Sequence, residues 1–234
     1  MANFKTHIAT SGVLGVGYGA TGFLVADIPL PTAVLAGGLC GVSGMLPDLD
    51  SDSGVPLRES MAFAAAVVPM LLMDRFRVLF NSPELIVLAG ALVYLFIRFV
   101  LSAWLKRYTV HRGMFHSIPA AIIAAQVAYL LCSAGGIEMR AYKAGAVFVG
   151  FMSHLMLDEF YSLEWYRGRM RLKRSFGTAL KLWGKSTWGN ASTYIKLAAL
   201  TFLVLNDENW MHQLAPHAEH FQQLAEQLTD RMRF

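Results

Sequence analysis

Residues that could bind a metal ion gather in four short blocks of an otherwise apolar chain. The blocks are THIA at 6–9, LPDLDSD at 46–52, HRGMFHS at 111–117 and SHLMLD at 153–158. Mixed imidazole and carboxylate ligands suit zinc, manganese or iron better than calcium. The chain therefore predicts a site for one or two divalent transition-metal ions, with zinc as the first choice. The candidate ligands are His7, Asp48, Asp50, Asp52, His111, His116, His154 and Asp158.

The spacing inside these blocks favours a shared site. His154 and Asp158 are four residues apart, so on a helix they lie on one face and can approach a single ion. The three aspartates of 46–52 alternate along the chain and repel one another unless a cation neutralises them. The five-residue spacing of His111 and His116 does not fit one helix face, which places the first in a loop. The alternative for the pair in 153–158 is a buried histidine satisfied by a local carboxylate.

The acidic block also invites comparison with a calcium-binding EF-hand loop. Asp48, Asp50 and Asp52 have the spacing of that motif, but its sixth position is Ser53 instead of glycine, and Pro56 interrupts the second half of the loop. An all-oxygen calcium site would also leave the histidines without a role. A transition-metal site is the better interpretation.

Two further residues are candidates for catalysis. Arg112 stands between two candidate ligands, and its planar guanidinium could bind a phosphoryl oxygen. The alternative for Arg112 is one more positive charge at a membrane boundary. Glu159 points about 100° away from Asp158 on a helix, so it could serve as a general acid or base or lie on the surface.

Composition indicates an integral membrane protein. Hydrophobic residues make up 55% of the 234 positions and charged residues only 15%, with a mean hydropathy of +0.44. Soluble domains are usually about one quarter charged, whereas a membrane-crossing helix needs about 20 apolar residues. A large soluble module is excluded.

The elements that must position the candidate ligands are helices, so the predicted fold class is an all-α, polytopic membrane bundle. The second and third helices are short and could form a re-entrant pair. Residues 1–205 form the predicted membrane domain, and 206–234 form a C-terminal amphipathic interfacial helix. The seven predicted apolar helices span about 8–26, 32–46, 60–73, 83–105, 118–134, 141–157 and 190–205.

Lysine and arginine are distributed unevenly between the two predicted sides of the membrane. With a cytoplasmic N-terminus, the inner side carries about twice as many of them as the outer side. All four ligand blocks then fall at the cytoplasmic ends of helices. The predicted location is a bacterial-type inner membrane, crossed several times.

The blocks resemble a known family in their order and spacing. The stretches at 6–9, 46–50, 111–117 and 153–158 resemble the YdjM-type inner-membrane proteins, a family described as membrane-bound metal-dependent hydrolases. The resemblance implies that His7, Asp48, Asp50, His111, His116, His154 and Asp158 are the shared polar positions. No such motif follows residue 165.

The leading hypothesis is a metal-dependent hydrolase, a phosphoesterase that acts on a lipid or lipid-linked substrate through metal-activated water. The alternatives are a divalent-metal transporter or sensor and a non-catalytic membrane scaffold with a structural ion. The expected partners are membrane lipids, including anionic headgroups at the basic run 167–174. Nucleic acid is not expected, because no nucleic-acid-binding motif supports the basic run. The oligomeric state is left open.

Overall fold

The computed structural model describes residues 3–50, 55–108, 114–133, 135–166, 169–172, 177 and 179–208, without the side chains of 49–50, 55–56, 106–108, 163–166 and 169–172. Its elements follow one another along the chain as mostly antiparallel helices. In order they are α1 (Phe4–Val25), α2 (Leu30–Ser43), the 3-10 helix η1 (Leu46–Asp50), α3 (Val55–Leu71), α4 (Met73–Leu79), α5 (Pro83–Leu95), the π-helix η2 (Phe96–Leu101), α6 (Ser102–Tyr108), α7 (Ile118–Leu131), α8 (Gly136–Phe160), β1 (Leu163–Tyr166), β2 (Arg169–Leu172) and α9 (Thr187–Leu205).

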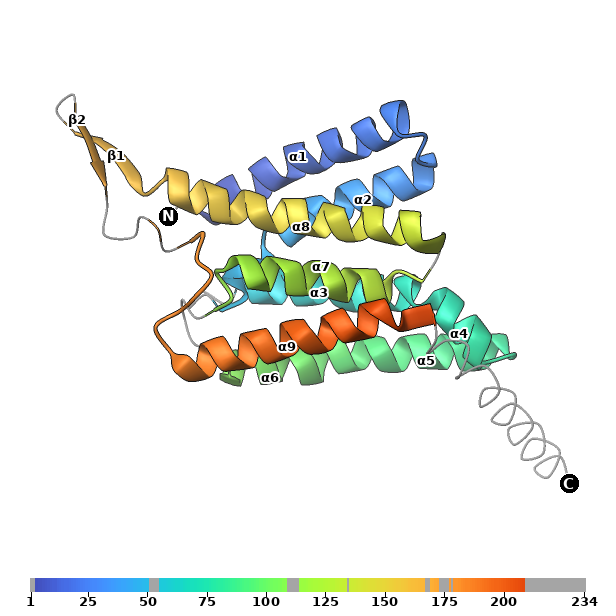
Figure 1. Ribbon diagram of the computed structural model, residues 1–234. Helices are drawn as coiled ribbons and strands as arrows, with labels where there is room; N and C mark the ends of the chain where they lie inside the picture. Colours follow the sequence, from blue (N-terminus) through green and yellow to red (C-terminus); the bar gives the residue numbers. More distant parts are fainter. Residues whose placement is uncertain are drawn as a thin grey trace, which may run out of the picture.

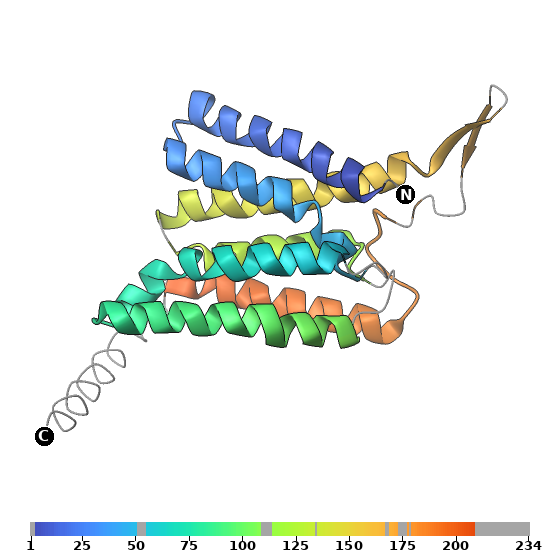
Figure 2. The same ribbon diagram turned by 180° about the vertical axis from the view of Figure 1, so that it is seen from behind.

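The long helices lie side by side along one common direction, so the bundle has two ends (Figures 1 and 2). Helix α1 packs on α2, α2 on α8, α8 on α7 and α7 on α9, while α3 packs on α5. We call the end where α1 and α9 begin and α8 stops the site end, and the opposite end the far end. The β1–β2 hairpin projects from the site end (Figure 1).

Each of the seven predicted apolar stretches is mostly helical within the described residues. The predicted all-α fold is confirmed for the bundle, and the described residues add one short antiparallel hairpin, in which Leu163–Tyr166 pairs with Arg169–Leu172. In its register Leu163 pairs with Leu172 and Trp165 with Met170, a two-residue alternation typical of strands. The predicted helix at 206–234 lies outside the described residues from 209 onward, so the domain boundary stays a prediction.

Two stretches of the described chain are long and apolar enough to cross a membrane, Phe4–Val25 and Pro83–Leu105. Their apolar side chains face outward, with Val13 76% and Val87 72% exposed. Apolar surface of this kind is rare on soluble monomers and marks contact with lipid or a partner. The apolar helices α2 and α7 are shorter, and the seven-crossing arrangement stays a prediction.

Small residues let α1, α2 and α8 approach closely. The buried face of α1 carries His7, Ser11, Gly15, Gly19 and Gly22 at helical spacing. A Cβ atom on Gly15 would lie 2.3 Å from the carbonyl oxygen of Gly37 on α2, so the backbones are in direct contact, as at other small-residue interfaces in membranes. This contact fixes the rotation of α1 and therefore the direction in which His7 points.

The same close packing makes Gly150 of α8 intolerant of a side chain. A Cβ atom there would lie 2.0 Å from the carbonyl oxygen of Cys40, whereas Gly38 has nothing within 4 Å of its Cβ position. We expect Gly150→Ala to lower the free energy of unfolding by about 1–3 kcal/mol through overpacking, and Gly38→Ala to leave it unchanged or higher. Thermal unfolding of both variants in detergent checks this. Equal melting temperatures for the two variants would contradict the packing.

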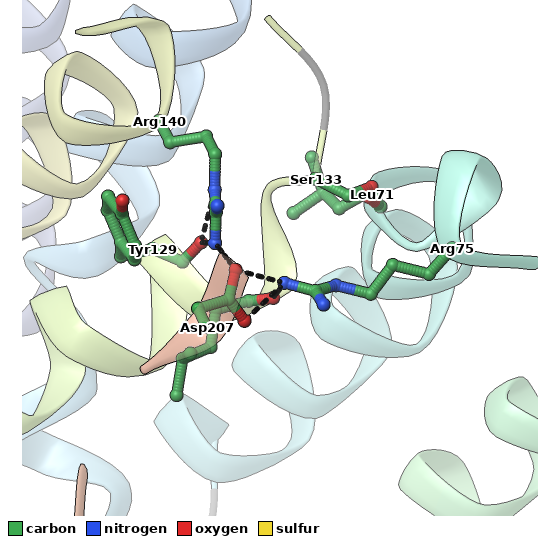
Figure 3. A network of polar contacts seen from close by, with 7 residues as sticks. Leu71, Arg75, Tyr129, Ser133, Arg140 and Asp207 are labelled. Carbon is green, nitrogen blue, oxygen red and sulfur yellow. Dashed lines mark hydrogen bonds and ion pairs between the residues drawn. The ribbon is translucent and has the colours of Figure 1, made fainter. Parts of the chain in front are cut away.

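A polar network closes the far end of the bundle (Figure 3). Asp207, just after α9, accepts hydrogen bonds from Arg75 of α4 at 3.0 Å and from Arg140 of α8 at 2.6 Å. Arg75 also donates to the Leu130 carbonyl and Arg140 to the Tyr129 carbonyl, both on α7. The guanidinium of Arg140 lies 4.1 Å from the Tyr129 ring centroid. The network therefore connects α4, α7, α8 and the end of α9.

Candidate metal centre

Five of the predicted ligands meet at the site end of the bundle. His7 lies in the first turn of α1, Asp48 in η1, His116 just before α7, and His154 and Asp158 in the last turns of α8. The exposed fraction of each histidine is at most 4%, and that of Asp158 is also 4%, whereas Asp48 is half-buried. Residues separated by up to about 150 positions are thus collected in one buried place.

The distances between their donor atoms suit a metal centre. His7 Nε2 is 3.3 Å from Asp158 Oδ1, and His116 Nε2 is 3.5 Å from Asp48 Oδ1. His154 Nε2 lies 3.6 Å from both Asp48 Oδ1 and Asp158 Oδ2. Ligand atoms about 2.1 Å from a tetrahedral ion are about 3.4 Å apart. Among the described residues, two overlapping groups could hold an ion: His7, His154 and Asp158; and Asp48, His116 and His154.

His154 belongs to both groups, and its orientation is fixed. Its Nδ1 atom lies 2.7 Å from the backbone carbonyl oxygen of Gly44. A carbonyl only accepts, so Nδ1 carries the proton and Nε2 presents its lone pair. In the described part of the chain, Nε2 is buried without a hydrogen-bond partner while it faces the oxygens of Asp48 and Asp158. The lone pair of His154 Nε2 and the oxygens of the two carboxylates therefore face one another, an arrangement that favours a cation between them.

A single lone pair on His154 Nε2 can bind only one ion. The described residues therefore support one centre that uses His154. The two histidine rings nearest to it are arranged around it, with the His7 ring stacked at 3.6 Å and the His116 ring edge-on at 5.5 Å between centroids.

Local structure holds the two ligands that come from helix starts. Asn3 caps α1, since its side chain accepts the backbone N–H of Thr6 at 2.8 Å, and Ser11 Oγ donates to the Gly41 carbonyl of α2 at 2.7 Å. Ser117 caps α7, because its Oγ accepts the Ala120 N–H at 3.3 Å. These hydrogen bonds hold the backbone beside His7 and His116 and so fix the positions of the two ligands.

The histidines stabilise the charged form of Asp48. Burial acts to raise the pKa of this carboxyl, but the neighbouring His116, His154 and His7 outweigh it and hold the pKa below its usual value. An ionised carboxylate is the form that binds a metal ion.

Four predicted site residues are not placed. Asp52, His111 and Arg112 lie outside the described residues, and of Asp50 only the backbone, at the end of η1, is described. Glu159 is described, and its carboxylate accepts the backbone N–H of Gly177 at 2.5 Å. It is not among the grouped donors. Its role in acid–base chemistry stays a prediction.

The carbonyl of Gly44 was not predicted from the sequence. A Cβ atom at this position would lie 2.4 Å from Ser11, so the residue must be glycine for α1 to approach and for the carbonyl to reach His154. Backbone carbonyls that orient metal-binding histidines are common. The only signal in the sequence was a glycine two residues before the acidic block.

Comparison with known families gives a decisive match. The model of the YdjM inner membrane protein family matches residues 1–183. The chain belongs to this family. The predicted resemblance is therefore confirmed, and membrane association follows from the family and from the apolar helices. The family match includes every candidate ligand and ends before α9. No curated protein and no solved structure matched the chain.

Proposed function

We propose that the protein is a membrane-embedded, metal-dependent hydrolase, a phosphoesterase that acts on a lipid or lipid-linked substrate. The observation that carries the proposal is the convergence of three histidines and two aspartates with donor atoms 3.3–3.6 Å apart. Buried histidines and carboxylates from four separate segments would be costly to assemble without a bound cation, because each must give up its hydration.

The described residues would divide the work. His7, His154 and Asp158 are almost fully buried and would hold the ion from the protein interior. Asp48, with 22% of its side chain exposed, marks the side from which water and substrate could enter. A zinc, manganese or iron ion held there would act as a Lewis acid that makes water nucleophilic near neutral pH. Arg112 is the expected partner of the substrate's anionic group.

A lipid substrate is supported by the aromatic side chains around the site end. Trp104 of α6, Tyr161 just after α8, Trp183 in the segment before α9 and Trp188 of α9 lie at this end, and each is at least 47% exposed. Tryptophan and tyrosine favour the boundary between lipid tails and water. We infer that this boundary passes the metal centre, so that a headgroup reaches it from the membrane. The multi-pass topology, cytoplasmic N-terminus and headgroup binding at 167–174 belong to the same proposal.

Elemental mass spectrometry of detergent-purified protein tests the first step. We expect about one equivalent of a transition metal per chain, with hydrolysis of at least one lipid phosphate or phospholipid that is lost in EDTA. Asp158→Asn should lose both properties. Asp27→Asn is the matched control, because Asp27 is exposed beyond α1 with φ 52°, a conformation that asparagine tolerates. Protein purified without chelator yet free of metal would overturn the proposal.

Burial favours a second candidate, a membrane scaffold with a structural ion. His154 is 0% and His7 2% exposed, as expected where protein ligands close the coordination shell. Cobalt-substituted protein separates the two functions. A visible spectrum that changes on adding phosphate or azide indicates an open coordination position and supports the hydrolase, whereas an unchanged spectrum supports the scaffold.

A further inference from the structure

The segment 179–186, which we call the strap, crosses the site end between the hairpin and α9 (Figure 1). Its sequence is ALKLWGKS, and neither a motif nor the proposed reaction gives it a role. It contains no regular helix or strand, yet it contacts both the start of α7 and helix α9. Its inner side faces the bundle, and its outer side is exposed.

The inner side of the strap holds the loop that carries His116. The Ile118 N–H donates to the Lys181 carbonyl at 3.1 Å, at the residue where α7 begins. A Cβ atom on Gly184 would lie 3.0 Å from the sulfur of Met114, two residues before His116. The strap therefore contacts the His116 loop on both sides of the ligand.

Helix α9 in turn fixes the strap. The Asn190 side chain accepts the Gly184 N–H at 2.7 Å and donates to the Gly184 carbonyl at 2.9 Å, so it pairs with both backbone groups of one residue. Tyr194 Oη donates to the Leu182 carbonyl at 2.9 Å, and its ring stacks on Trp183 at 4.6 Å. Asn190 is thus a positioning residue that acts on His116 through the strap.

The outer side is apolar and exposed. Leu182 is 52%, Trp183 66% and, at the start of α9, Trp188 81% exposed, and they lie beside the exposed cation Lys185. The apolar stretch Pro83–Leu105 ends at the same end of the bundle, where Trp104 is 55% exposed. The strap therefore continues the lipid-facing surface at the level where headgroups begin, and tryptophan, leucine and lysine are the residues that occupy that level.

We propose that the strap is an interfacial membrane anchor whose inner side clamps the His116 loop, so that contact with the bilayer and order at the metal centre depend on one segment. The second half of this inference rests on the proposed metal site. The partner is the lipid surface itself, with anionic headgroups near Lys185.

Tryptophan fluorescence in vesicles of phosphatidylethanolamine and phosphatidylglycerol tests the anchor. The emission of Trp183 is taken as the difference between wild type and Trp183→Phe. We expect brominated lipid to quench it, more strongly with bromine at carbons 6 and 7 than at carbons 11 and 12. Emission that is unchanged by bromine and quenched by aqueous iodide would overturn the anchor and indicate a surface for a soluble protein partner.

Two matched variants test the clamp. We expect Asn190→Ala to lower the affinity for cobalt about 10-fold or more, as loss of an orienting contact does, and to change the cobalt absorption spectrum. The side chain of Asn206 donates to the Phe202 carbonyl at the other end of α9. Asn206→Ala should therefore change neither the cobalt affinity nor the spectrum. Equal spectra for the two variants would overturn the clamp. Absence of metal in wild type would instead overturn the proposed function, and the fluorescence result would still decide the anchor.

Discussion

Replacing His154 with alanine is expected to lower metal affinity by more than about 100-fold, since even outer contacts of a metal site contribute 10–100-fold. His154 is the residue common to both groups of donors. Without His154, two separate pairs of ligands remain, His7 with Asp158 and His116 with Asp48. Neither pair has the further nitrogen ligand that His154 supplies to a tetrahedral site. Metal content by elemental mass spectrometry and affinity by competition with a chelating dye measure the effect.

His154→Ala also removes a fully buried ring, so unfolding must be separated from loss of the ligand. His154→Gln keeps more of the volume and a hydrogen-bonding group, and it should lose metal to a similar extent while retaining a cooperative thermal transition. His217→Ala is the control, because that histidine lies outside the four ligand blocks and is not a candidate ligand. Retention of a full metal equivalent by folded His154→Gln would contradict the assignment of the centre.

The second large effect is expected at the far end. Asp207→Asn removes the carboxylate that Arg75 and Arg140 share (Figure 3), and leaves the buried guanidinium of Arg140 and the partly buried one of Arg75 without their counter-charge. Breaking a buried ion pair from one side costs about 3–5 kcal/mol. We expect the free energy of unfolding in detergent to fall by about that amount, seen as a lower midpoint in a denaturant titration.

Asp74→Asn is the matched control for this prediction. Asp74 pairs with Arg77 at 3.4 Å, but their side chains are 46% and 67% exposed, and such surface pairs contribute about 0–1 kcal/mol. A similar midpoint for the two variants would show that the shared carboxylate does not hold α4, α7, α8 and the end of α9 together. The proposed metal centre is at the opposite end, so we expect folded Asp207→Asn to have the same metal content as wild type.

Short-range patterns in the sequence were sufficient to predict the helices and part of the candidate metal site. Apolar runs predicted the helices α1, α2, α3, α5, α7, α8 and α9 because a run of apolar residues is a local property of the sequence. The four-residue spacing of His154 and Asp158 predicted a shared face, and in the structure their side chains lie 3.6 Å apart. The hairpin was missed because its two-residue alternation is only four residues long in each strand.

Only the tertiary structure decided which polar blocks meet and how closely. His7 reaches Asp158 because Gly15, Gly37 and Gly150 allow the backbones of α1, α2 and α8 to touch, a contact that depends on the relative rotation of three helices. The Gly44 carbonyl that orients His154 comes from another helix end. The role proposed for the strap depends on its contact with the start of α7. Residue types and local spacing thus determined which side chains could bind a metal, and long-range packing determined the distances between their donor atoms.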